Sequence, residues 1–202
     1  MGGLLWLSRV IDGISERIGK FVYWLLLAAV LISSINAIVR KAFNVSSNAY
    51  LEAQWYLFAA VFMLGAGYVF LHDQHVRIDI ISSRLKRKTQ VWIDVIGITV
   101  FLIPLCIVVA NMSLPSVMLA ISNQEVSANP GGLIRWPLYI LVPIGFSLLC
   151  LQSMSELIKR VAFLMDRAPD PHAAPEKTNE ELLLEELQHE MALAEARKGG
   201  AK

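Results

Sequence analysis

YLEAQWYLFAAVFMLGAGYVFLHDQHVRID, residues 50–79, is the stretch that decides the fold. Its first part, 50–71, is almost entirely apolar, and a helix of that length would cross a hydrocarbon core of about 30 Å with some tilt. The polar groups lie at its edges: Glu52 near the start and a charged cluster at the end, His72, Asp73, His75, Arg77 and Asp79. The pattern is typical either of an ordinary membrane span with its loop, or of a helix and loop that dock onto another membrane subunit.

The composition places the chain among integral membrane proteins. Of its 202 residues 55% are hydrophobic, the mean hydropathy is +0.53, and the apolar residues are gathered into long runs. The two cysteines, Cys106 and Cys150, lie inside apolar runs and predict neither a disulfide framework nor a metal site. The first strongly apolar run begins only at Phe21 and is too long for a signal core, so no cleavable signal peptide is expected.

The apolar runs predict an all-α membrane domain over 21–168, with four spanning helices at about 21–39, 50–71, 91–109 and 138–157. Pro104 is expected to bend the third span, and Pro143 with Gly145 the fourth. Residues 112–135 are expected to form a polar loop between these two spans. Residues 1–20 show apolar positions at steps of three and four, which is typical of an amphipathic helix in the membrane interface: Leu4, Leu7, Ile11, Ile14 and Ile18.

The basic residues near the spans are unevenly distributed, and this predicts the orientation. The 1–20 segment, the loop after residue 71 and the exit of the fourth span are rich in Lys and Arg, whereas the other two loops have only Arg40, Lys41 and Arg135. The positive-inside rule therefore predicts both termini in the cytoplasm. Residues 169–202 are predicted to be a stiff linker and an acidic tail helix, which is either solvated or bound to a partner.

Little in the chain predicts chemistry of its own. The only carboxylates in the apolar parts of the spans (138–154 in the fourth) are Glu52 and Asp94, each near an end. The four histidines fall in a loop or in the tail, whereas haem ligation in a bundle needs histidines that face each other in its core. We expect no enzymatic activity, no cofactor or metal, and no nucleic-acid partner. The chain is predicted to be a component of a complex.

The second span carries small residues that permit close helix packing. Ala53, Ala60 and Gly67 repeat at seven, with Ala59 and Ala66 beside them. Small residues in register allow membrane helices to approach closely. The sequence leaves two partners open for this stripe, another subunit or the chain's own bundle.

An ordered set of motifs resembles the small membrane (Q-type) subunit of tripartite ATP-independent periplasmic (TRAP) transporters. The set covers roughly positions 15–165, and its members are Glu52, Trp55, Gly65-Ala66-Gly67, His75-Val76-Arg77-Ile78-Asp79, Trp92-Ile93-Asp94, residues 125–137 (EVSANPGGLIRWP), Pro143-Ile144-Gly145-Phe146 and Ser155-Glu156-Leu157-Ile158-Lys159-Arg160. The tail after Pro169 lies outside the resemblance.

The resemblance implies a four-helix scaffold subunit in a bacterial or archaeal inner membrane. It would assemble with a large multi-span subunit that moves like an elevator, while a periplasmic solute-binding protein delivers an organic acid. Uptake would use a sodium gradient. The alternatives are an anchor subunit of a membrane redox complex, and a stand-alone small exporter.

Specific residues are expected at the partner interfaces. We expect His75, Arg77 and Asp79 to fix the cytoplasmic end of the second span, with Asp94 as a possible partner, while membrane lipids hold the basic loop. Glu125 and Arg135 could meet the solute-binding protein, unless the loop around them only shapes the entry into the fourth span. The remaining interface candidates are Glu52, Trp55, Ala60, Gly65, Gly67 and Trp136.

Overall fold

The computed structural model describes residues 2–43, 48–72 and 85–169, and these fall almost entirely in the first of two compact units, Met1–Arg167. The elements are α1 (Gly2–Phe43), α2 (Asn48–Leu71), α4 (Arg87–Gly97), the π-helix η1 (Ile98–Leu102), α5 (Ile103–Ser122) and α6 (Trp136–Leu164). The described residues contain no strand, only one isolated bridge between Val126 and Ile134. In this part of the chain four helices are long and apolar enough to cross a membrane, which confirms the predicted all-α four-span class.

α1 is a single helix of 42 residues. At 1.5 Å per residue it is about 60 Å long, twice the thickness of a hydrocarbon core. The expected interfacial helix over 1–20 and the first span therefore share one continuous helix. Most of the apolar stripe of the first 20 residues points away from the bundle, since Leu4, Leu7 and Ile14 are exposed. That orientation suits contact with lipid, and the interfacial position of this segment stays a prediction.

The third membrane helix runs without a break from Arg87 to Ser122 through α4, η1 and α5. It continues past the expected end of the span because the residues after Val109 remain largely apolar, so the loop before α6 begins only at Asn123. Pro104 lacks an N–H, and its ring would clash with the carbonyl of Val100 in a regular helix. The π-helical turn η1, where the Ile103 N–H bonds to the Ile98 carbonyl, lies directly before this proline.

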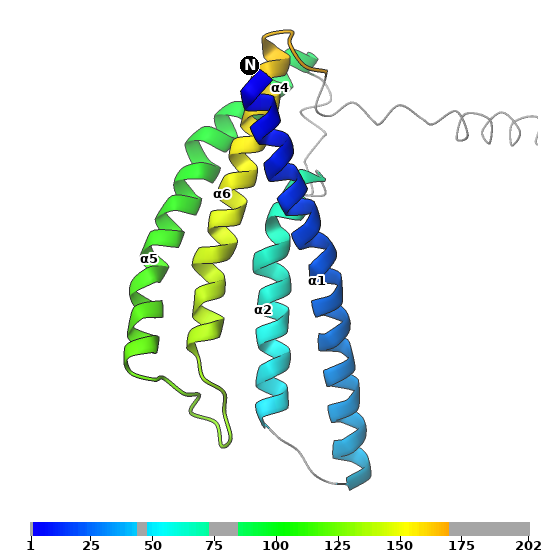
Figure 1. Cartoon of the computed structure of the whole chain (residues 1–202), viewed down its shortest axis with the longest axis vertical. Coiled ribbons are helices and arrows are strands. Elements are labelled where there is room, and N and C mark those ends of the chain that lie inside the picture. Colours follow the sequence, from blue (N-terminus) through cyan, green and yellow to red (C-terminus); the bar gives the residue numbers. More distant parts are fainter. Residues whose placement is uncertain (1, 44–47, 73–84, 170–202) are drawn as a thin grey trace, which may run out of the picture. The chain divides into compact units, whose positions relative to one another are not determined.

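α6 is the central helix of the unit and contacts α5, α2 and α1, while α1 also packs along α2 (Figure 1). α2 packs closely on α6 at Gly145. A Cβ added there would lie 2.7 Å from the Met63 carbonyl oxygen, so no larger residue fits without a shift. Likewise, a Cβ at Gly19 of α1 would collide with the ring of Tyr68 on α2. Glycines therefore set the spacing at two helix crossings.

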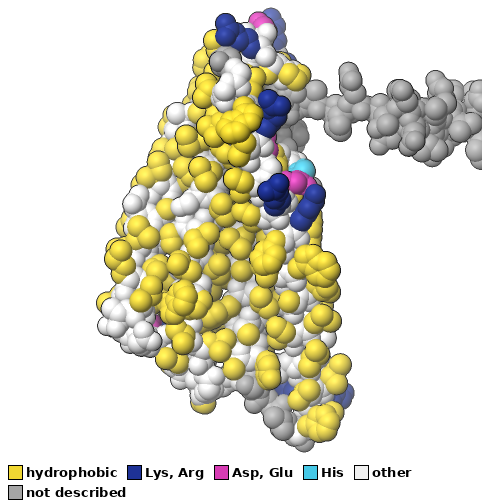
Figure 2. Space-filling view, viewed as in Figure 1, with side chains coloured by type: hydrophobic (Ala, Val, Ile, Leu, Met, Phe, Trp, Pro, Cys, Tyr) yellow, Lys and Arg dark blue, Asp and Glu magenta, His cyan; other side chains and the backbone are white. Residues whose placement is uncertain are grey.

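The burial pattern is the reverse of that in a water-soluble protein. Large apolar side chains such as Trp24, Phe62 and Phe101 are exposed, and Figure 2 shows hydrophobic side chains over most of one face. Several of the most buried side chains are polar, including Gln152, Ser153 and Arg160. In lipid an exposed apolar surface carries no penalty, whereas polar groups need partners inside the protein.

The charged residues that the structure describes concentrate at the two ends of the bundle. We call "basic end" the end that carries the start of α1, the end of α2, the start of α4 and the end of α6. We call "loop end" the opposite one, where α1 and α5 end, α2 and α6 begin, and residues 123–135 connect α5 to α6 (Figure 1).

Candidate functional site

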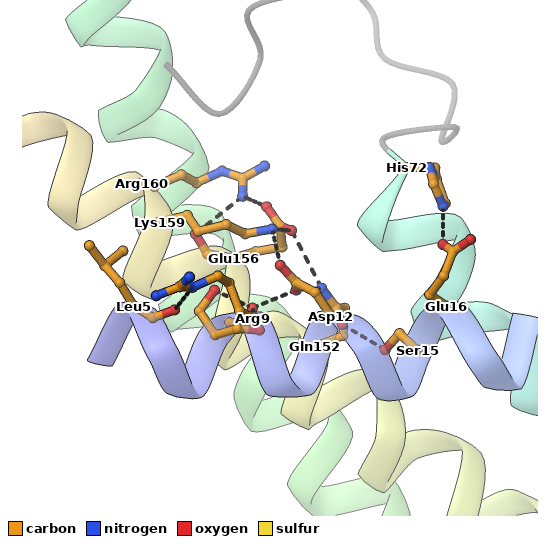
Figure 3. Close-up of polar contacts among 12 residues, drawn as sticks. Leu5, Arg9, Asp12, Ser15, Glu16, His72, Gln152, Glu156, Lys159 and Arg160 are labelled. Carbon is orange, nitrogen blue, oxygen red and sulfur yellow. Dashed lines mark hydrogen bonds and ion pairs between the residues drawn. The ribbon is translucent and has the colours of Figure 1, made fainter. Parts of the chain in front are cut away.

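A polar network at the basic end joins α1 to α6 (Figure 3). Asp12 of α1 accepts hydrogen bonds from Ser155 Oγ at 2.7 Å, Gln152 Nε2 at 2.8 Å and Lys159 Nζ at 3.1 Å. Ser15 donates to Gln152 Oε1 at 2.6 Å, one turn further along. The two helices are thus held together by side chains that repeat every three or four residues on the facing sides of both.

The same network continues through charged residues of α6 towards α4. Glu156 accepts hydrogen bonds from Lys159 and Arg160, and Arg160 Nε lies 3.4 Å from Asp94 Oδ2. Arg160 is only 1% exposed and Glu156 4%. Charges at that depth are tolerated because each has an opposite charge within reach. With Lys159 bound to Asp12 as well, two cations and three carboxylates tie α1, α4 and α6 into one assembly.

Sequence reasoning missed most of this network. It placed Asp94 near the end of a span and named it as a possible partner of His75, Arg77 and Asp79. The structure pairs Asp94 with Arg160 of α6, a contact that the sequence did not predict. A usable signal was present in the first 20 residues, where Ser8, Asp12 and Ser15 recur at the same helical spacing as the apolar stripe. In a membrane protein the helix face that carries small polar side chains is the one that packs inward, and Ser8 and Ser15 of α1 are buried here.

A smaller set of polar contacts joins α1 to α2 at the basic end. His72 Nε2 lies 2.9 Å from Glu16 Oε2 (Figure 3), and the rings of His72 and Tyr68 are 4.4 Å apart. Tyr68 also accepts a hydrogen bond from Tyr23. His75, Arg77 and Asp79, expected to fix this end, lie outside the described residues.

At the loop end, Glu52 of α2 holds the 123–135 loop. This carboxylate is 4% exposed and accepts hydrogen bonds from the Ser127 hydroxyl, from Asn129 Nδ2 at 2.7 Å and from the Leu133 amide at 2.7 Å. The Tyr56 hydroxyl, one turn along α2, donates to the Ile134 carbonyl at 3.3 Å. The loop is therefore anchored to α2, although it connects α5 to α6.

The loop is also ordered internally. The Ser127 amide donates to the Leu133 carbonyl and the Arg135 amide to the Glu125 carbonyl, both at 2.9 Å, around the Val126–Ile134 bridge. Gly131 has a φ of +73°, which a glycine adopts without strain. A Cβ at Gly132 would lie 2.5 Å from the Ser127 Cβ. The Asn-Pro-Gly-Gly sequence thus makes a tight turn that leaves Ser127 and Asn129 in reach of Glu52.

Glu125 and Arg135 form an ion pair at the base of this loop. Arg135 Nη1 lies 3.2 Å from Glu125 Oε1 and 3.5 Å from the Tyr139 hydroxyl, and both charged side chains are more than a third exposed. The Tyr139 hydroxyl and then the Glu125 carboxylate, which accept these hydrogen bonds, raise the pKa of Arg135 above its usual range. A permanent cation and a carboxylate are therefore presented together at the surface of the loop end.

Of the other residues predicted at a partner interface, some are buried in the bundle and others are exposed at its surface. Gly65 and Gly67 are buried in the chain's own bundle, where Gly67 faces Ser15 of α1 and α6. Ala60 is partly exposed. Trp55 is 62% exposed, and Trp136, the first residue of α6, is 38% exposed. Trp55 lies seven positions from the exposed Phe62, so both project from one outer face of α2.

Comparison with known proteins gives a family for the chain. Residues 29–163 match the family described as tripartite ATP-independent periplasmic transporters, DctQ component. No curated protein and no solved structure matches the chain. The matched range includes α2, α4, α5, almost all of α6, the Glu52-anchored loop and most of the charged network. Because the match covers more than half of the chain, the chain belongs to the DctQ family and is the small membrane component of a TRAP transporter.

Proposed function

We propose that this chain is a static scaffold, which holds a large multi-span membrane subunit while that subunit moves solute. Uptake of an organic acid is driven by a sodium gradient, and a periplasmic solute-binding protein delivers the solute. The complex lies in the inner membrane of a bacterium or an archaeon. The chain itself carries no catalytic step and no cofactor.

The scaffold role is supported by the complete hydrogen bonding of both polar networks. In the described ranges, every buried side-chain nitrogen or oxygen has a hydrogen-bond partner. At the basic end the network ties α1 to α4 and α6, and at the loop end Glu52 ties α2 to the loop between α5 and α6. Satisfied buried polar groups make an arrangement specific and rigid. An elevator mechanism needs such a rigid element at constant depth.

The large subunit is proposed to bind through an apolar face. Trp55 and Phe62 project from α2, and at such an exposed apolar surface another membrane helix can replace lipid. Ala60 and Trp136 are proposed to border this contact. Glu52, Gly65 and Gly67 support it from inside the bundle, because they fix α2 against its neighbours.

The solute-binding protein is proposed to dock on the 123–135 loop. The exposed ion pair of Glu125 and Arg135 sits on a loop whose shape Glu52 maintains. Crosslinkers placed at position 125 or 135 of the assembled transporter test this. Adducts with the solute-binding protein are expected, and adducts with only this chain or the large subunit would refute the docking.

His75, Arg77 and Asp79, which lie outside the described residues, are proposed to contact the large subunit at the basic end. Arg77→Ala with Asp79→Ala is expected to reduce both complex recovery and uptake. The matched control is Lys88→Ala with Asp166→Ala, which also removes one positive and one negative charge at this end but from an exposed ion pair, and it should leave recovery and uptake unchanged. Unchanged assembly and uptake in the first double variant would refute this contact.

Reconstitution tests the scaffold role directly. The chain should co-purify with a large membrane protein, and proteoliposomes that contain both should take up a labelled organic acid only with the binding protein and an inward sodium gradient. The purified chain alone should transport nothing. A coloured complex with a haem or flavin spectrum would instead indicate an anchor of a redox complex, which the family match does not favour.

A further inference from the structure

A polar pocket lies at the loop end between the last turns of α1 and the first turns of α2. Its volume is about 420 Å³, and it is open to the surface. The residues that line it are Ser33, Asn36, Ala37, Arg40 and Lys41 of α1 with Leu51 and Gln54 of α2. It is separate from the Glu52-anchored loop, and neither of the networks described above uses its side chains.

The chemistry of the lining is one-sided. Five of its side chains carry hydrogen-bond donors, two of these are cations, and no carboxylate lines the pocket. Among the described residues, neither Arg40 nor Lys41 forms an ion pair. Basic residues in the last turn of a helix interact favourably with its dipole. That effect accounts for Arg40 and Lys41, but not for the convergence of Asn36 and Gln54 from two helices on the same space.

The surroundings of the pocket are apolar. Ile35 and Ile38 of α1 and Tyr50 of α2 are strongly exposed next to the lining residues. Such side chains need contact with acyl chains, and the pocket therefore lies where a span ends and phospholipid headgroups begin. A guanidinium binds phosphate oxygens through paired N–H groups, and an ammonium adds a point charge.

We propose that this pocket binds the phosphate group of a membrane phospholipid, with Arg40 and Lys41 on its oxygens and Asn36 and Gln54 as additional donors. The acyl chains of the lipid would lie along the apolar surface beside the pocket. The bound lipid would fill the space between α1 and α2 at the loop end, opposite the end where charged side chains join the helices. The inference is independent of the solute and of the large subunit.

Native mass spectrometry of the full-length chain in mild detergent, titrated with phosphatidylglycerol, tests the site. Wild type is expected to retain one lipid at low lipid concentration. The Arg40→Gln, Lys41→Gln variant is expected to bind it about tenfold more weakly or worse, because both cationic contacts are lost. The matched control is Arg17→Gln, Lys20→Gln, which removes the same charge from the other part of α1 and should leave retention unchanged.

Two further measurements distinguish the sources of the anion. Inorganic phosphate and succinate at millimolar concentration should not displace the lipid, because neither has acyl chains. If either displaces it, the site binds a free anion and the lipid assignment is wrong. Asn36→Leu with Gln54→Leu gives a second test that keeps both cations, and it should also weaken retention. Equal retention by wild type and both pocket variants would overturn the proposal.

Discussion

Glu52 accepts three hydrogen bonds from the 123–135 loop, one of them from the Leu133 amide. Glu52→Ala removes all three, so Leu133 should lose its protection. We expect hydrogen exchange at that amide to be faster by tenfold or more, on the order expected for loss of a hydrogen bond to a charged group. Glu125→Ala is the control, because it removes an exposed carboxylate of the same loop but leaves the Leu133 amide bonded. Unchanged exchange at Leu133 in Glu52→Ala would show that the loop keeps its shape without α2.

Lys159 lies between the carboxylates of Asp12 and Glu156. Lys159→Met leaves these two negative charges facing each other at a mostly buried contact, so unfolding in detergent should become easier by about 3 kcal/mol. Lys88→Met is the control, since the side chains of its ion pair with Asp166 are 62% and 76% exposed. An exposed pair of that kind contributes less than about 1 kcal/mol. Similar melting of the two variants would contradict the role of the network.

The positions of the spanning helices could be predicted from the sequence better than the face of each helix that packs inward. Long apolar runs are enough to predict four spanning helices because only a helix satisfies its own backbone in lipid. The inner face of α1 was not predictable from apolar periodicity, because Leu4, Leu7 and Ile14 face outward while Ser8 and Ser15 are buried. For α2 the small residues could be identified from the sequence, but not whether Gly67 packs within this bundle or against a partner. The structure places Gly67 beside Ser15 and Gln152 of the same bundle.

The crossing of α2 and α6 depends on one glycine. In Gly145→Ala the new Cβ would meet backbone and Cβ atoms of Met63 at 2.7 and 2.8 Å, and backbone has little room to move. The two helices must separate slightly, at an expected cost of about 1–3 kcal/mol in detergent. Gly97→Ala at the end of α4 meets nothing within 4 Å and should be neutral or slightly stabilising. Equal stability of the two variants would mean that α2 and α6 adjust without cost.

The charges of the whole unit bear on its orientation. Among the described residues, the basic end carries Arg9, Arg17, Lys20, Lys86, Arg87, Lys88, Lys159, Arg160 and Arg167, and the loop end carries Arg40, Lys41 and Arg135. Lys159 and Arg160 form ion pairs with carboxylates of the chain, but this does not weaken the prediction that the basic end is cytoplasmic. The positive-inside rule acts during insertion and counts basic residues rather than net charge.

A topology assay settles the orientation, and with it which partner can reach which end. Green fluorescent protein fused after the last residue should fluoresce, and alkaline phosphatase there should be inactive, because the C-terminus is predicted in the cytoplasm. Phosphatase inserted in the 123–135 loop should be active. Active phosphatase at the C-terminus with an inactive loop insertion would mean that the chain has the opposite orientation in the membrane. It would place the Glu125–Arg135 pair in the cytoplasm, where a periplasmic binding protein cannot meet it, and the proposed docking would then be wrong even if the scaffold role held.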